Sequence, residues 1–515
     1  MRRSISLLLL LSFLLASCQI SKPSTAPPTP TKTDIADKST PLPQEDPPTF
    51  PDWDDRSALE SGLIPLYQDI LGEMPDTTIY HLDLNIDEDL IHVTGSQEVR
   101  YTNQEDIALD EVYFHLMPNY LGEEMLISVV QINGADVDFA LEMQDTVMRV
   151  PLEISLSVGE NVMIKIDFVT TVPTRLESNY GILASTEGVL ALAHAYPMVA
   201  VYDDEGWNID TPSEQGDVTY LDMSFYLVRV NAPIDLVLVA SGNEITHQST
   251  GDRQVALYAA APARDFYIAA SEEYVRIQKD FGDYVINCYT PEILEDGAEM
   301  AIEVAAASID FFSERFAPYP YTEFDIVSTP TYALGIEYPG MTAIREGLFD
   351  LSADIAGTST SIYLESTMAH EVGHQWFYHL VGNDQLDEPW LDESLTQYIT
   401  WQYYLAQYGN NGGAGFAQAL HGRWDRVDHA KVPLGLPVSA YEDAEYGAII
   451  YGRGAFFFEA LAEEIGEDAF NAFLADYTQS QAWSIASTES LREIAEKHCD
   501  CDLEDLFRAW VYPIE

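Results

Sequence analysis

The sequence predicts a multidomain chain in which a mainly-β N-terminal region, residues 76–272, precedes a mostly helical α/β region, residues 273–515. In the first region apolar and polar residues alternate, as they do from Tyr80 to Ile86 and from Val162 to Phe168, which is the period of half-buried strands. In the second region apolar residues recur at helical spacing over long segments. The roughly 460 residues after position 52 are enough for two or three domains with sizeable cores.

The expected elements follow this division in chain order. Besides the two alternating runs, strand-like segments lie at residues 220–230 and 236–240, and a short strand-rich stretch continues to residue 289. Helical patterns then take over and cover residues 298–316, 362–380, 391–404, 446–465, 469–477, 489–497 and 503–510. The pattern switches only once, which is why we expect a β domain followed by a helical one.

A leader is expected before these domains. Arg2 and Arg3, an apolar run over residues 5–15 and the tetrad that ends at Cys18 resemble a bacterial lipoprotein signal peptide. The apolar run is too short to span a bilayer, which takes about 20 residues. We therefore expect residues 1–17 to be removed and Cys18 to be lipidated, so that the exported protein is anchored to a bacterial membrane, at the cell surface or facing the periplasm. The alternative is an ordinary secretory signal with an incidental cysteine.

The composition of the chain narrows its possible partners. Residues 18–52 are rich in proline and threonine, which predicts an extended linker that cannot build a core. The chain has 24 Lys and Arg against 85 Asp and Glu, a formal charge of −61, so it would repel phosphate backbones and nucleic acid is not an expected partner.

The cysteines besides the leader cysteine are Cys288, Cys499 and Cys501. The last two are too closely spaced for an easy disulfide, and we expect no disulfide framework.

The most specific pattern is His370-Glu371-Val-Gly-His374, followed after eighteen residues by Glu393. Positions i and i+4 share one face of a helix, so the two histidines can offer their imidazoles to one metal ion while Glu371 lies beside it. Two neutral imidazoles and one carboxylate leave zinc with an open position, where the pKa of water falls to about 7. This is the layout of a zinc hydrolase.

Local sequence predicts that these residues lie on two helices. Hydroxyl groups at residues 358–360 can cap a helix that runs through both histidines. A break between Gly382 and Pro389 ends that helix. A second helix, expected from about Leu391, places Glu393 in its first turn, where it can face the first helix.

Two further motifs resemble the aminopeptidase N family of gluzincin metallopeptidases, in the form of a short bacterial lipoprotein member. The run Gly335-Ile-Glu337-Tyr-Pro-Gly340 is similar to the family's Gly-Ala-Met-Glu-Asn motif, although the residues on either side of Gly335 depart from it and alter the expected first side-chain pocket. Tyr451-Gly-Arg-Gly454-Ala is similar to the family's Tyr-Glu-Lys-Gly-Ala segment. The resemblance implies a β saddle domain, a thermolysin-like α/β catalytic domain and one Zn²⁺ per chain.

The resemblance also implies a role for each motif residue. Glu371 would act as general base, and the phenol of Tyr451 would stabilise the oxyanion that forms during attack on a peptide carbonyl. Glu337, in the substrate-binding segment that begins at Gly335, would hold the α-ammonium group of the substrate. The expected substrates are therefore peptides with a free N-terminus. Tyr446 is a candidate neighbour of the site. The other histidines, including His194, His379, His421 and His429, are expected to be surface or packing residues rather than ligands, and His194 is the one among them that is also a candidate for lining the cleft.

Two other functions remain open at this stage. The chain ends close to the end of the family's catalytic domain, so we expect an open cleft, and a metalloendopeptidase with such a cleft is the nearest alternative. A non-catalytic surface binding module on the same fold is the other. It would be expected to lack a metal ligand or Glu371, and the sequence keeps all of them.

Overall fold

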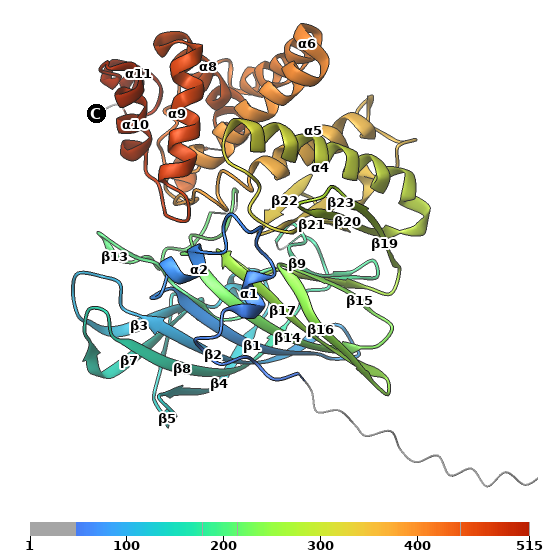
Figure 1. The fold of residues 1–515 in the computed structure, drawn as a ribbon, viewed down its shortest axis with the longest axis vertical. Helices are drawn as coiled ribbons and strands as arrows, with labels where there is room; N and C mark the ends of the chain where they lie inside the picture. The colour runs from blue at the N-terminus through green and yellow to red at the C-terminus, as the bar shows by residue number, and fades with distance from the viewer. Residues whose placement is uncertain (1–47, 178, 214, 443, 514–515) are drawn as a thin grey trace, which may run out of the picture. The chain divides into compact units, whose positions relative to one another are not determined.

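The computed structural model describes residues 48–177, 179–213, 215–442 and 444–513. The predicted signal peptide, Cys18 and nearly all of the predicted linker lie outside these ranges. The described residues form one compact unit (Figure 1). Within the described residues, no helix is both long and apolar enough to cross a membrane.

The first half of this unit is built from β-sheets, and the largest sheet has eight strands in the order β16-β17-β14-β1-β2-β8-β4-β5. Strands β1 and β14 run parallel, and the other neighbours run antiparallel. Burial alternates along β8 because one face of the strand packs on the core. The strand bounds are β1 Thr78–Ile86, β2 His92–Thr102, β4 Met125–Ile132, β5 Ala135–Asp136, β8 Asn161–Thr171, β14 Ser224–Pro233, β16 Asn243–Thr250 and β17 Arg253–Ala263.

Three smaller sheets complete the β region, in the orders β15-β18-β10-β9, β11-β3-β7-β6 and β12-β13. Buried side chains from these strands and from the large sheet join in one apolar core, to which Leu82, Phe168 and Leu190 belong. The strand bounds are β3 Leu109–His115, β6 Ala140–Glu142, β7 Val147–Leu156, β9 Leu183–Thr186, β10 Val189–Leu192, β11 Met198–Val199, β12 Tyr202–Asp203, β13 Gly206–Trp207, β15 Val237–Ala240 and β18 Ile268–Ser271.

The second half begins with a five-stranded sheet in the order β19-β20-β21-β23-β22. Helices α4 (Glu295–Arg315) and α5 (Thr360–Gly373) lie over this sheet (Figure 1). Strand β22 forms the edge and pairs antiparallel with β23. The strand bounds are β19 Tyr274–Asp280, β20 Val285–Pro291, β21 Glu323–Thr329, β22 Gly335–Tyr338 and β23 Met341–Arg345.

Helices make up most of the remaining chain. Two of the helices are preceded by π-helical turns, Trp390–Ser394 before α6 and Ile449–Arg453 before α8. The other bounds are α6 Leu395–Trp424, α7 Glu445–Ala448, α8 Gly454–Ile465, α9 Glu467–Ser480, α10 Thr488–Cys499 and α11 Glu504–Trp510, together with the short helices α1 Ser57–Glu60, α2 Ile70–Glu73 and α3 Met117–Tyr120 and the strand pair β24 Asp354–Ile355 and β25 Thr358–Ser359.

The order of a mainly-β region followed by a helical one confirms the predicted fold class, but one helix is shorter than predicted. The helix expected over residues 362–380 ends at Gly373, and His374 caps its C-terminus. Beyond it the chain turns back at Tyr378, whose φ is 122°. The apolar residues after His374 are buried, but they lie in this turn and not on a helix. Their spacing therefore predicted the wrong secondary structure.

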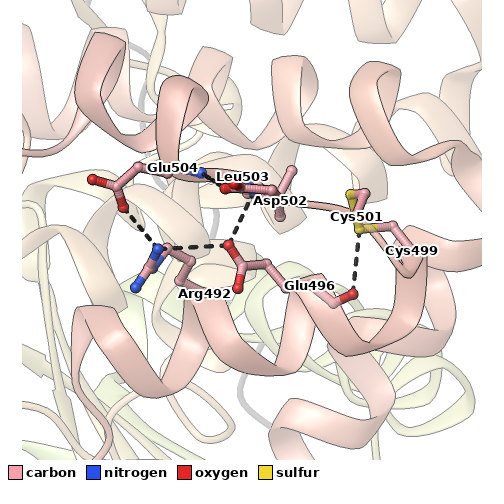
Figure 2. The surroundings of a disulfide bond; sticks show 7 residues. All are labelled: Arg492, Glu496, Cys499, Cys501, Asp502, Leu503 and Glu504. Atoms are coloured by element: carbon pink, nitrogen blue, oxygen red, sulfur yellow. Dashed lines mark hydrogen bonds and ion pairs between the residues drawn. A yellow bond between two sulfur atoms is a disulfide. The ribbon is translucent and has the colours of Figure 1, made fainter.

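The expectation that Cys499 and Cys501 form no disulfide is wrong. The two cysteines are bonded, with Cα atoms 5.1 Å apart, which lies within the usual range (Figure 2). Asp500 between them adopts a left-handed conformation at the end of α10, and this turn brings the neighbouring residues together. On the same helix Arg492 pairs with Glu504, 2.8 Å away, so the disulfide lies where α10 meets the start of α11.

Arg264 joins the β region to the helical region. Its buried guanidinium donates hydrogen bonds to the carbonyl oxygens of Leu221, Tyr378 and Ser484, at 3.0, 2.9 and 2.7 Å. Gly382 packs directly on it, since a Cβ at that position would lie 2.2 Å from the guanidinium carbon. These contacts link the end of β17 to the turn that follows the two histidines of the sequence motif.

We expect Arg264→Met to destabilise the protein by about 3–5 kcal/mol, because the apolar side chain leaves three buried carbonyl oxygens without a donor. Urea unfolding, followed by fluorescence, measures the shift in midpoint. The matched control is Arg508→Met, which removes an arginine from the exposed face of α11 and should shift the midpoint little. Equal midpoints for the two variants would contradict this role for Arg264.

Candidate active site

The three predicted metal ligands meet at one point. His370 lies in the last turn of α5, His374 caps that helix, and Glu393 lies in the π-helical turn before α6 rather than in the first turn of α6 itself. The two Nε2 atoms are 3.2 Å apart, and Oε2 of Glu393 lies 3.0 Å from Nε2 of His370 and 3.5 Å from Nε2 of His374. Tetrahedral zinc with bonds of about 2.0–2.1 Å separates its ligand atoms by roughly 3.3 Å. The three groups therefore fit zinc.

Neighbouring groups orient both imidazole rings. Nδ1 of His374 donates to the carbonyl oxygen of Phe377 at 2.9 Å, which leaves Nε2 free to bind a metal. The side-chain amide of Gln397, on α6, lies 3.3 Å from Nδ1 of His370. Oε1 of Gln397 accepts a hydrogen bond of 3.0 Å from Arg423, so this ring is held by a two-residue chain. Burial lowers the pKa of His370 to about 4, which keeps the ring neutral as a ligand must be.

Glu371 lies beside the ligands, and Gly335 makes room for it. A Cβ at Gly335 would lie 2.5 Å from Oε1 of Glu371, because edge strand β22 passes close to α5 at this point. Burial, reinforced by the carboxylate of Glu337, raises the pKa of Glu371 well above its ordinary value. Gly335 was predicted as part of the substrate-binding segment, and the structure adds that a larger residue there would displace the side chain of Glu371.

Tyr451 reaches the site from the second π-helical turn. Its hydroxyl group donates a hydrogen bond to Oε1 of Glu393. Burial and the charge of Glu393 raise the pKa of Tyr451 well above 10, so the phenol stays protonated and remains a donor. The ring of Tyr446 lies 5.7 Å from that of Tyr451, and both line the same cavity, as the sequence led us to expect of Tyr446.

The two π-helical turns pack directly on each other. Oγ of Ser394 donates to the carbonyl oxygen of Ile450 at 2.8 Å. A Cβ at Gly454 would lie 1.9 Å from that same Oγ, so only glycine allows this approach. The contact fixes Glu393, on one turn, relative to Tyr451 on the other. Irregular turns of this kind are frequent at functional sites.

A second group of carboxylates lies next to the metal ligands. Nε2 of Gln385 donates to Oε1 of Glu337 at 3.2 Å and to Oδ2 of Asp392 at 2.9 Å. The carboxylate of Asp217, from the segment before β14, lies within 4.8 Å of those of Glu337 and Asp392. Burial raises the pKa of Glu337, and burial together with Glu393 raises that of Asp392 to about 7. This pocket is short of positive charge.

Sequence reasoning missed three members of this pocket. Asp392 immediately precedes the metal ligand Glu393, and this adjacency is the one signal that could have identified it. Gln385 lies in the predicted break between two helices, and Asp217 lies far away in the β region. No local pattern marks either residue, since only the fold brings them to Glu337.

All of these groups line one cavity of about 1070 Å³. The β region contributes His194 to its wall as well as Asp217, and Nδ1 of His194 lies 2.9 Å from the carboxylate of Asp265. His379, which we expected to be a surface or packing residue, is buried and also lines the cavity. The predicted catalytic, substrate-binding and metal-binding residues therefore share one space.

Comparisons of the sequence agree with this geometry. Residues 300–510 match the model of the Peptidase family M1 domain. The chain is 26% identical to aminopeptidase M1-B of Oryza sativa subsp. japonica over 321 residues and 26% identical to aminopeptidase M1 of Arabidopsis thaliana over 313 residues. Each match covers 56% of this chain and 34% of the relative, so the chain spans about a third of the length of these relatives.

Solved structures share the architecture. The M1 zinc metallopeptidase of Deinococcus radiodurans is 19% identical to this chain with a TM-score of 0.61, and the match covers 85% of this chain and 93% of that one. A variant of that metallopeptidase bound to a Tyr-Ser-Ala substrate also has a TM-score of 0.61, at 19% identity, with 85% and 94% covered.

The fold is therefore that of the two-domain M1 zinc metallopeptidases. Residues 300–510 are similar to the Peptidase family M1 domain, in agreement with the resemblance to the aminopeptidase N family that the motifs around Glu337, His370 and Tyr451 predicted. The triad of His370, His374 and Glu393 provides the site for its Zn²⁺.

The purified protein should contain about one zinc per chain, and His374→Ala should lose most of it, because two remaining ligands bind zinc far more weakly than three. Elemental mass spectrometry of the dialysed protein measures the metal content. His421→Ala, an exposed histidine on α6, is the matched control and should keep its zinc. Retention of a full zinc equivalent by His374→Ala would remove His374 from the ligand set.

Proposed function

We propose that this protein is a zinc-dependent aminopeptidase that hydrolyses the N-terminal residue from peptides with a free N-terminus. The observation that carries the proposal is the position of Glu337. Its buried carboxylate faces the same cavity as the metal ligands, and its only partner within hydrogen-bonding distance among the described side chains is Gln385. A buried carboxylate with a single hydrogen-bond partner can bind a cationic group of the substrate.

The residues of the site have distinct tasks in the proposed reaction. When bound, zinc supplies a Lewis acid and lowers the pKa of a water molecule at its open position. Glu371 accepts the proton of the attacking water and then delivers it to the leaving amine. The phenol of Tyr451 donates a hydrogen bond to the carbonyl oxygen as negative charge grows on it, and one such donor typically contributes about 10²–10³ in rate.

Charge selects the substrate end that can enter. Glu337, Asp392 and Asp217 gather three carboxyl groups beside the zinc site, and burial raises the pKa of each because it disfavours the charged form. The ammonium group of a free N-terminus supplies the missing positive charge and can donate hydrogen bonds to these carboxylates. An acetylated N-terminus is neutral and cannot. The relatives from rice and Arabidopsis are aminopeptidases by name, which supports the proposal that a free N-terminus is required.

A metalloendopeptidase is the alternative that the geometry also supports. Zinc, Glu371 and Tyr451 would act on any peptide bond, and the cavity is larger than one residue requires. The two functions differ in whether a free ammonium group is needed, and only the pocket around Glu337 depends on that group.

Glu337→Gln should lower kcat/KM for free-amine peptides by about 30- to 1000-fold, because losing the charge-assisted contact costs roughly 2–4 kcal/mol in transition-state binding. Paired fluorogenic peptides with free and acetylated N-termini, cleaved by zinc-quantified protein, measure the effect. The wild type should cleave the acetylated member poorly. The matched control is Glu365→Gln, another glutamate of the cavity wall, which should keep the preference for the free amine. Equal wild-type rates on both peptides would contradict the aminopeptidase proposal and favour the metalloendopeptidase.

We also propose that the protein is an exported lipoprotein, anchored to a bacterial membrane through acyl groups on Cys18. The proposal rests on the leader sequence, which lies outside the described residues. The proline- and threonine-rich residues after Cys18 would then hold the catalytic unit away from the membrane surface.

Cys18→Ser should move the protein from the membrane fraction to soluble or unprocessed forms, because the acylated thiol is lost. Fractionation and mass spectrometry of the mature N-terminus report the outcome. Cys288→Ser, at a cysteine outside the leader, should stay with the membrane. An unmodified mature terminus that begins elsewhere would refute the lipoprotein assignment.

A further inference from the structure

The cavity wall contains two arginines that have no contact with substrate in the proposed reaction. Arg423, at the end of α6, and Arg426, in the turn that follows, are the only Lys or Arg residues among the described residues that line it. The whole chain has 24 basic residues against 85 acidic ones. Two neighbouring cations in one cavity of such a chain favour an anionic ligand.

Neither arginine is held in an ion pair with a described carboxylate. Glu365, an acidic residue of the same wall, accepts a hydrogen bond from the hydroxyl of Tyr408 instead, and Asp425 pairs with His429. The guanidinium of Arg426 is exposed and free to contact a ligand in the cavity.

The arginines and the acidic pocket adjoin different parts of the metal site. Arg423 donates to Gln397, which contacts His370, and to the carbonyl oxygen of Tyr451 at 3.2 Å. Glu337 instead lies beside His374, within 4.8 Å of its ring nitrogen. A peptide with its ammonium group at Glu337 can thus extend past the zinc ligands toward the arginines.

The spacing limits how long that peptide is. A single glutamine side chain, Gln397, spans the gap between His370 and Arg423, through contacts of 3.3 and 3.0 Å. An extended peptide advances about 3.3–3.6 Å per residue. The guanidinium of Arg423 is therefore within about three residues of the bond that would be cleaved, and Arg426 follows it in the next turn of the same wall.

We propose that Arg423 and Arg426 form a subsite for the free C-terminal carboxylate of short peptides, which makes the enzyme favour substrates of about two to four residues. This inference rests on the proposed aminopeptidase function and adds the other end of the substrate to it. Guanidinium groups bind carboxylates through paired, charge-assisted hydrogen bonds. In a protein with a formal charge of −61 they also offset the repulsion that an anionic terminus meets elsewhere.

Arg426 is the residue on which to test the subsite. Arg423 also positions Gln397 and the backbone of Tyr451, so its loss would disturb the metal site whether or not it binds substrate. Arg426 makes no hydrogen bond to the described part of the catalytic site. Arg508→Gln is the matched control, since it removes the same charge from the exposed surface of α11.

The experiment compares trialanine as the free acid with trialanine amide, using zinc-loaded full-length protein at fixed ionic strength. The wild type should cleave the acid with a kcat/KM about tenfold or more above that of the amide, mainly through KM. Arg426→Gln should bring this ratio close to one, and Arg426→Lys should restore part of it. Arg508→Gln should keep the wild-type ratio. A third peptide, Ala-Glu-Ala amide, places the carboxylate on a side chain and should be cleaved no better than trialanine amide.

The outcomes separate this inference from the function on which it rests. Equal wild-type cleavage of acid and amide, an unchanged ratio in Arg426→Gln, or full recovery with the side-chain carboxylate would each overturn the C-terminal subsite. In all three cases rapid cleavage of free-amine peptides and slow cleavage of their acetylated forms would leave the aminopeptidase intact. Failure to distinguish free from acetylated N-termini would overturn both.

Discussion

Buried negative charge is the constraint on which the rest of the site depends. Glu337, Glu371, Asp392 and Glu393 are all buried around two histidines, and Asp217 approaches the same pocket. Carboxylates are expensive to bury unless cations or hydrogen-bond donors face them. A zinc ion and a substrate ammonium group are the cations that this pocket is arranged to receive. Metal binding and substrate choice therefore both depend on the charge of these buried carboxylates.

Close backbone packing holds these groups in register. Gly335 lets the edge strand β22 approach Glu371, and Gly454 lets two π-helical turns touch, so that Glu393 and Tyr451 face one point. Arg264 and Gly382 attach the turn after His374 to the β region, from which Asp217 reaches the pocket. The β region is thus part of the active site and not only a support for it.

The cavity wall carries groups of both charges. Glu337 lies near His374 and Asp217, whereas Arg423 contacts the backbone of Tyr451 and the Gln397 that lies beside His370. A zwitterionic peptide has the opposite arrangement of charge, with an ammonium group at one end and a carboxylate at the other. Such complementarity orients a short substrate before the reaction begins and contributes more to specificity than to affinity.

The sequence by itself determined the metal ligands, Glu371 and the division into β and helical regions, because fixed spacing on a helix and alternation along strands are local properties. It also indicated Glu337 and Tyr451 through motifs. Only the tertiary structure decided the end of α5 at Gly373, the disulfide of Cys499 and the recruitment of Asp217, Gln385 and Arg426, since these depend on turns and on contacts between segments far apart in the chain. The periodicity of apolar residues carries no information about such contacts, so the local sequence pattern could not predict them.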